Sequence, residues 1–151
     1  MRQLQNAVSI GGAVIGAMLL ATPAPAAAPA LADLKIVKEC SQYTGDTPSF
    51  CTVIESNVAA IPKGTKIWYW GPDLGVADPV MTNSAALIDA GIGNTALGHC
   101  IVDQRDAANQ VGMCAFSAGS GTLMGFNAII KVTEDAQQNF HWDGSYWTAG
   151  K

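Results

Sequence analysis

Positive charge is scarce in this sequence. Only eight of the 151 residues are lysine or arginine, against twelve aspartates and glutamates, and no basic run occurs. A nucleic-acid-binding surface needs clustered positive charge to meet the phosphates. The composition therefore excludes nucleic acid as a partner. The acidic residues are scattered, which favours solubility rather than an acidic binding tail.

Motifs for cofactor chemistry are also missing. No Gly-Lys-Ser or Gly-Lys-Thr follows the glycines at 119–125, and Gly125 comes one residue too late for a dinucleotide fingerprint. No Cys-x-x-Cys pair occurs, and His99 and His141 are far apart in sequence. We therefore expect no cofactor and no metal site.

Long helical patterns are scarce as well. The best helix candidate, residues 83–91, is short and ends at Gly91. Short apolar segments instead alternate with turn-forming residues, which is typical of strands. The pattern predicts eight strands, near residues 34–40, 50–56, 65–70, 79–90, 95–103, 111–117, 124–134 and 140–147. It indicates an all-β protein, either a closed barrel or a sandwich.

The N-terminal apolar run, "AVSIGGAVIGAMLLA", is too short for a comfortable membrane span. It follows Arg2 and precedes an alanine- and proline-rich stretch with several Ala-x-Ala cleavage sites. We interpret residues 1–32 as a cleaved secretory signal peptide, with an uncleaved anchor as the alternative. Residues 33–151 then form a single domain that is secreted or periplasmic and has no membrane association after cleavage.

Four cysteines in an exported chain predict two disulfides. Cys40 and Cys51 flank one stretch rich in turn residues, and Cys100 and Cys114 flank another. Each pair would lie opposite across a hairpin, where Cα separations of roughly 4.5–5.5 Å allow a bridge. Of the three possible pairings, we predict Cys40–Cys51 and Cys100–Cys114.

The glycine-rich stretch "AGSGTLMGF", with "GHCIVD", "GMCAFSAG" and "FHWDGSYW" around it, resembles the dirigent and allene oxide cyclase barrel superfamily and its small exported bacterial members. The resemblance covers about residues 95–147. It implies an eight-stranded antiparallel β-barrel, here stapled by two disulfides, whose lumen could take an apolar small molecule. It also implies that Gly119, Gly121 and Gly125 are turn glycines. No catalytic residue of the family maps onto this chain.

Two residues are candidates for acid–base chemistry. If Cys40 faces Cys51, Glu39 shares a face with apolar neighbours such as Val37, where burial would raise the pKa of its carboxyl group. If Cys100 faces Cys114, His99 lies opposite Ala115 and could titrate inside the barrel. The alternatives are an outward-facing Glu39 and a hydrogen-bonded core histidine.

Aromatic side chains supply candidate ligand contacts. Strand alternation places Trp142 and Tyr146 on one face of the last strand, and Tyr69 shares a face with Ile67. We predict that Tyr69, Trp142 and Tyr146 line an apolar cavity. Plain core packing is the alternative.

These observations favour an exported small β-barrel that binds an apolar small molecule. One alternative is a structural or interaction module whose barrel is filled with side chains, and another is a cyclase or isomerase. No feature of the sequence assigns an oligomeric state.

Overall fold

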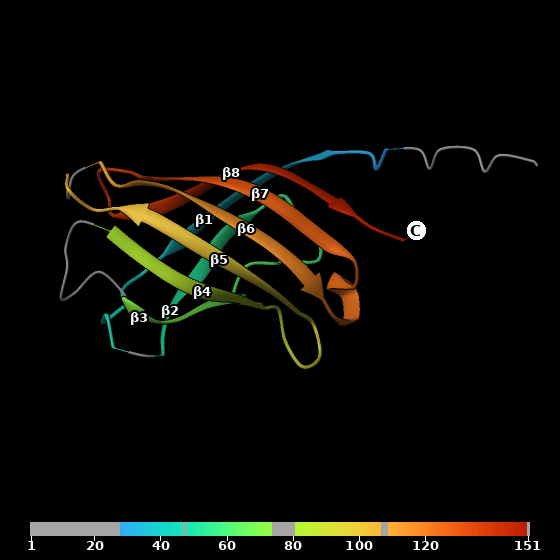
Figure 1. Cartoon of the computed structure of the whole chain (residues 1–151), viewed down its shortest axis with the longest axis horizontal. Helices are drawn as coiled ribbons and strands as arrows, with labels where there is room; N and C mark the ends of the chain where they lie inside the picture. The colour runs from blue at the N-terminus through green and yellow to red at the C-terminus, as the bar shows by residue number, and fades with distance from the viewer. Residues whose placement is uncertain (1–27, 47, 74–80, 107–108, 151) are drawn as a thin grey trace, which may run out of the picture.

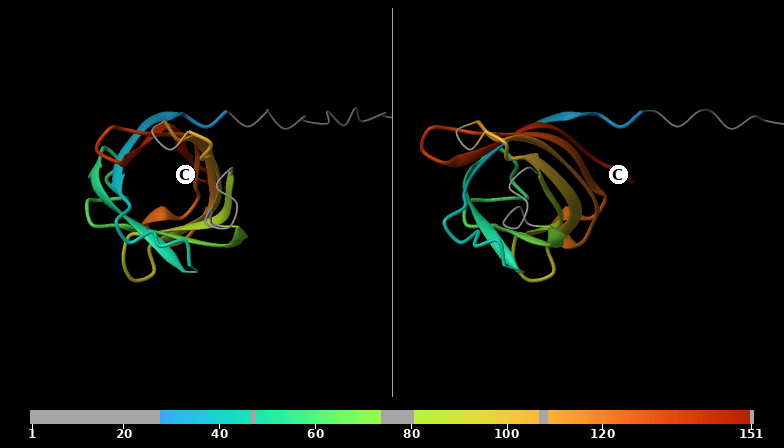
Figure 2. Two further views of the ribbon diagram at one scale, coloured as in Figure 1. Left: turned by 90° about the vertical axis from the view of Figure 1, so that its left-hand side faces the viewer. Right: turned by 60° about the vertical axis from the view of Figure 1, so that its left-hand side comes forward.

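A computed structural model describes residues 28–46, 48–73, 81–106 and 109–150 of the chain. Eight antiparallel strands close into a barrel in sequence order, because β8 pairs back with β1 (Figures 1 and 2). The elements are β1 (Ala32–Glu39), β2 (Ser49–Ser56), β3 (Lys66–Asp73), β4 (Met81–Asp89), β5 (Thr95–Asp103), β6 (Val111–Gly119), the 3-10 turn η1 (Gly121–Leu123), β7 (Phe126–Glu134) and β8 (Asn139–Thr148). The predicted all-β barrel is confirmed, and the sandwich is excluded.

Most of the predicted signal peptide, residues 1–27, lies outside the described residues. In the described part of the chain, no helix has the length and apolar character needed to span a membrane. Two disulfides in a small barrel fit an oxidising, exported compartment.

Residues 83–91 form most of β4 rather than a helix. Ser84, Ala86 and Ile88 are fully buried, whereas Asn83 and Ala85 are exposed. This alternation is the two-residue period of a strand with one face toward the core. The strand predicted near residues 79–90 is therefore confirmed, and the helix candidate within it is excluded because the two-residue spacing outweighs the helix propensity of its alanines.

Both predicted disulfides are confirmed. Cys100 and Cys114 are direct partners in the β5–β6 register, with their Cα atoms 4.1 Å apart. Cys40 follows β1 and bridges to Cys51 on β2, with a Cα separation of 4.2 Å. Cys51, Cys100 and Cys114 are each no more than 2% exposed, so both bridges face the interior of the barrel.

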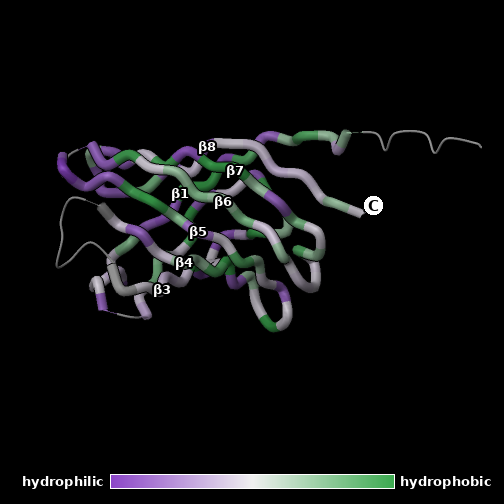
Figure 3. Tube along the Cα trace, viewed as in Figure 1, coloured by the Kyte–Doolittle hydropathy of each residue, from purple (hydrophilic) through white to green (hydrophobic). Residues whose placement is uncertain are grey.

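Apolar side chains fill one end of the barrel. At this end Val58 and Ile61 of the β2–β3 connection and Leu123 of η1 are buried. Phe126 stacks on Tyr146 beside them, with 5.7 Å between ring centroids. Hydrophilic residues are concentrated in the turns at the other end, on the left of Figure 3. The two ends of the barrel are therefore chemically different.

The glycines at 119–125 form a connection between β6 and β7, not a phosphate-binding loop. Gly121 and Gly125 have φ angles of 56° and 72°, in the left-handed region that favours glycine. Asn94 accepts a hydrogen bond from the Thr122 amide through its side-chain oxygen and holds η1 in place.

Gly119 has no room for a side chain. A Cβ atom there would overlap the backbone carbonyl of Leu123, whereas one at Gly64 would meet nothing within 4 Å. We expect Gly119→Ala to lower the free energy of unfolding by about 2–3 kcal/mol through this clash. Gly64→Ala is the control: its φ of 91° costs only about 1 kcal/mol. Urea unfolding of both variants checks this, and equal losses would contradict it.

Candidate ligand-binding site

A cavity of about 390 Å³ occupies the end of the barrel opposite η1. Buried residues of all eight strands form its walls, and Ser41, Gln137 and Gln138, which are exposed, lie at its rim. An eight-stranded barrel is wide enough for one small ligand when inward side chains do not fill it. Here the described side chains leave such a space at the end opposite η1.

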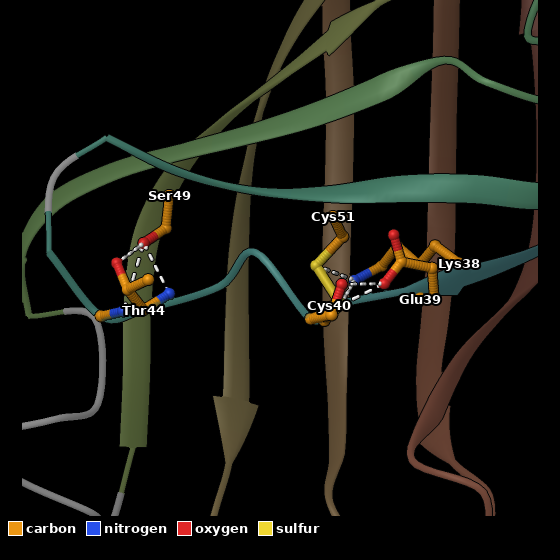
Figure 4. The surroundings of a disulfide bond; sticks show 8 residues. Lys38, Glu39, Cys40, Thr44, Ser49 and Cys51 are labelled. Carbon is orange, nitrogen blue, oxygen red and sulfur yellow. Dashed lines mark hydrogen bonds between the residues drawn. A yellow bond between two sulfur atoms is a disulfide. The ribbon is translucent and has the colours of Figure 1, made fainter.

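Lys38 extends into this cavity from the end of β1. It continues the inward alternation of Leu34 and Ile36 and is only 4% exposed. Its Nζ lies 3.5 Å from Cys51 Sγ and 3.6 Å from Cys40 Sγ, as Figure 4 shows. Sulfur is a weak hydrogen-bond acceptor, so these contacts hold the amine only loosely.

Three aromatic rings surround the same amine. Lys38 Nζ lies 5.2 Å from the ring centroid of Tyr69, 4.7 Å from that of Phe140 and 5.3 Å from that of Trp142. The described residues form two ion pairs, Arg105–Asp103 and His141–Asp135, and neither includes Lys38. The amine therefore has aromatic and sulfur neighbours in place of a carboxylate.

Burial lowers the pKa of Lys38 to about 7, because the cavity removes the water that would solvate an ammonium. The three rings act in the opposite direction, since their faces attract a cation. With a pKa of about 7, roughly half of the amine population is neutral near pH 7.

Five residues that line the cavity each carry a buried polar atom without a protein partner. These atoms belong to side chains on three strands (β4, β7 and β8) and in the connection before β6: Thr82 Oγ1, Ser84 Oγ, Gln110 Oε1, Glu134 Oε2 and Trp142 Nε1. Buried polar groups normally find a hydrogen-bond partner, and leaving one unpaired costs about 1–3 kcal/mol. Donors and acceptors that converge on one cavity with nothing to bind are what a ligand site requires.

Two of the cavity's titratable groups have raised pKa values. Burial raises the pKa of the Glu134 carboxyl group, and the neighbouring Asp135 charge adds to this. Burial also raises the pKa of the Tyr69 hydroxyl group, with a further contribution from Tyr43. Both groups therefore keep a proton more readily than usual.

Glu39 is not the buried acid that the sequence predicts. Its Oε2 accepts hydrogen bonds from the Ser41 backbone amide, at 2.9 Å, and from the Ser41 hydroxyl, at 2.6 Å. These bonds stabilise the carboxylate and lower its pKa. Glu39 shares a face with Val37 as expected, but that face points outward, although the residue lies at the cavity rim.

His99 does not enter the lumen either. It pairs with Ala115 in the predicted register, yet it is exposed on the outer face and hydrogen-bonds Asn83. The inward positions of β5 and β6 are instead taken by Cys100 and Cys114. The disulfide and the histidine are neighbours in sequence and so must face opposite sides of the sheet.

The three predicted ligand-contacting aromatics do not lie together. Tyr69 and Trp142 line the cavity, whereas Tyr146 packs on Phe126 at the filled end. Phe116 packs against Trp142, with 5.3 Å between ring centroids, and occupies space left by the missing side chain of Gly98. These two rings separate the cavity from the filled end.

Hydrogen bonds shape the turns at the cavity mouth. The Ser49 hydroxyl accepts from the amides of Thr44 and Gly45 and donates to the Asp46 carbonyl (Figure 4). In the β7–β8 turn, Asp135 accepts from two backbone amides and pairs with His141 at 2.8 Å. These two turns, of which the first lies next to the Cys40–Cys51 bridge, are therefore held by side-chain hydrogen bonds.

Sequence reasoning missed Lys38, although a signal was present. Leu34, Ile36 and Lys38 alternate with Lys35, Val37 and Glu39. The face that carries Leu34 and Ile36 is the more apolar of the two, so it should point into the barrel. Lys38 belongs to this face, and the buried charged residue is therefore a lysine.

Comparison with protein-family models, with curated proteins and with solved structures found no match to this chain. The resemblance to the dirigent and allene oxide cyclase superfamily stays a prediction from the glycine pattern and its flanking segments.

Proposed function

We propose that this protein is an exported binding protein that holds one small organic molecule in the barrel cavity. The observation that carries the proposal is that Lys38 and five residues with unpartnered polar atoms line a single cavity of about 390 Å³. A barrel that served only as a scaffold would gain stability by filling this space with apolar side chains.

The chemistry of the walls suggests the kind of ligand. Aromatic rings from Tyr69, Phe140 and Trp142 offer flat apolar contacts around the amine. Thr82 and Ser84 add hydroxyl groups from β4. The cavity therefore suits a partly apolar molecule that carries at least one oxygen to accept hydrogen bonds. This refines the purely apolar ligand that the sequence suggests.

Filling the cavity should abolish binding. The probe is 1-anilinonaphthalene-8-sulfonate, whose rings match the aromatic walls and whose sulfonate can accept from Lys38. Ser84 is fully buried and lines the cavity, so Ser84→Leu places an isobutyl group in the probe's space. We expect the probe to bind the wild-type chain at one site per barrel, and Ser84→Leu to weaken this about ten-fold or more. Fluorescence titration measures both.

Ala85 provides the matched control. It is the next residue along β4, but it is exposed on the outer face. Ala85→Leu adds the same isobutyl group outside the barrel and should leave the cavity site unchanged. Equal affinities of wild type and Ser84→Leu would place the probe on the outer surface and favour the filled-barrel module.

Glu134 favours a second candidate function, an isomerase or cyclase. Such an enzyme needs an acid or base inside the cavity, and Glu134 presents an unpartnered, buried Oε2 there with a raised pKa. Lys38 would be the complementary base. Conversion of a bound ligand, abolished by Glu134→Gln with binding retained, would distinguish this function from binding alone.

A further inference from the structure

The Lys38 amine has the surroundings of a nucleophile rather than those of a structural cation. A structural lysine in a protein interior is normally paired with a carboxylate. Lys38 is 4% exposed, and among the described residues its hydrogen-bond contacts are to the two sulfurs of one disulfide. Figure 4 shows the amine beside the Cys40–Cys51 bridge. Its nitrogen lone pair is thus not held by a strong partner.

We propose that Lys38 captures an aldehyde or ketone in the barrel cavity as an imine. This inference rests on the proposed ligand-binding function and names the ligand's reactive group. The carbonyl group is the class of electrophile with which a desolvated lysine amine forms a reversible covalent bond.

The reaction needs no oxidant or reductant. The neutral Nζ attacks the carbonyl carbon, the C=O π electrons move to oxygen, and a proton passes from nitrogen to oxygen to give a carbinolamine. Protonation of its hydroxyl group releases water while the nitrogen lone pair forms the C=N bond. The nitrogen then either loses its remaining proton, which gives a neutral imine, or keeps it, which gives an iminium ion. One amine and one carbonyl compound thus become one imine and one water.

Groups able to move these protons line the same cavity. The Glu134 carboxyl group, whose pKa burial raises, can donate a proton to the departing hydroxyl. The hydroxyl groups of Thr82 and Ser84 have no protein partner and can relay it. The other titratable groups that line the cavity are Glu39, whose carboxylate is bound to Ser41, and the phenols Tyr43 and Tyr69.

The aromatic walls favour a ring-bearing or conjugated carbonyl compound. Tyr69 of β3 and Phe140 and Trp142 of β8 surround Lys38 Nζ, so a planar group attached at that nitrogen would contact ring faces. Such contacts add to the stability of the adduct beyond the C=N bond itself.

Lys66 is a control built into the same molecule. Its Nζ also lies near two rings, 4.6 Å from the Phe50 centroid and 5.3 Å from that of Trp68, but the residue is exposed on the outside of the barrel. Comparison of Lys38 with Lys66 therefore separates the effect of the cavity from that of aromatic contact.

Reductive trapping tests the proposal on the wild-type chain with both disulfides intact. The protein is incubated at pH 7 with benzaldehyde and sodium cyanoborohydride, which turns an imine into a stable benzylamine, and peptide mass mapping then locates the benzyl groups. An ordinary lysine is almost fully protonated at pH 7. We expect Lys38 to be marked about ten-fold or more faster than Lys66, and this preference to vanish in urea.

Two variants and one competitor complete the design. Lys38→Arg keeps a positive charge but cannot form an imine, and it should abolish the fast benzylation seen at position 38. Lys66→Arg should keep it. Saturating anilinonaphthalene sulfonate should slow the marking of Lys38 and leave that of Lys66 unchanged. Equal marking rates for the two lysines in the folded wild-type protein would overturn the proposal without relying on any variant.

The outcomes also separate this inference from the proposed function. If the naphthalene probe binds the wild type and Ser84→Leu loses it, but Lys38 is not trapped, the cavity binds ligands without covalent capture. If the probe does not bind and Lys38 is not trapped, both proposals fail.

Discussion

Replacing all four cysteines with alanine is expected to leave the chain without a cooperative unfolding transition at 37 °C. The two bridges close loops with sequence separations of 11 and 14 residues. In the chain-entropy account each such loop contributes about 3 kcal/mol, so losing both costs about 6 kcal/mol. Domains of this size have total stabilities of roughly 5–15 kcal/mol. Circular dichroism during thermal unfolding measures the loss.

The paired variants separate the contributions of the two bridges. Cys100→Ala with Cys114→Ala removes a bridge that is buried on both sides, and Cys40→Ala with Cys51→Ala also removes the sulfur atoms beside Lys38. Each pair should lower the free energy of unfolding by about 2–4 kcal/mol. Quadruple-variant protein that melts at the wild-type temperature would show that packing alone holds the barrel.

The strands and disulfides could be predicted from the sequence because local chemistry determines them. Turn residues between Cys100 and Cys114 bring two strands back antiparallel, and once the register is set by the hairpin the two Cα atoms must be close. The observed strand ends differ from the predicted ones by only a few residues. In β6, for example, the strand continues to Gly119, where the chain turns into η1.

The candidate site was harder to predict because it depends on which face of each strand points inward. A shift of one residue exchanges the inner and outer sets. Strand alternation groups Glu39 with Val37 correctly, yet the inner position belongs to Lys38. The usual expectation that charges face water argues against an inward lysine, so Lys38 breaks the rule that otherwise assigns the faces.

The sequence pattern also does not show how far along the barrel axis each inward side chain lies. Trp142 and Tyr146 share the inward face of β8, but they are four residues apart, which is roughly 13 Å along a strand. Trp142 therefore reaches the cavity while Tyr146 packs at the filled end. Only closure of the barrel and burial of the β2–β3 connection decide which end is filled.

Lys38→Met is expected to make the protein more stable at neutral pH while removing the reactive amine. The pKa of Lys38 falls from 10.5 to about 7 on folding, so between those values the unfolded chain holds a proton that the native chain releases. Stability of the wild type therefore rises with pH through this window, and the penalty for burying the amine is complete below pH 7.

The size of the gain follows from the same shift. A pKa difference of this size corresponds to roughly 4–5 kcal/mol, and the cation–π contacts with Tyr69, Phe140 and Trp142 offset part of it. We expect Lys38→Met to raise the free energy of unfolding by about 2–3 kcal/mol at pH 6. The difference from wild type should shrink toward zero by pH 10. Urea unfolding of both proteins at pH 6, 8 and 10 gives this difference directly.

Comparing the two proteins at each pH cancels the titration of Glu39, Tyr43, Tyr69 and Glu134, which line the same cavity in both. Lys66→Met is the matched control, because Lys66 is exposed and its loss should change stability by no more than about 0.5 kcal/mol at any pH.

A Lys38→Met variant less stable than wild type at pH 6 would show that the aromatic rings hold a structural ammonium. A more stable variant that no longer traps benzaldehyde would show that Lys38 trades stability for chemistry, as functional groups in protein interiors commonly do.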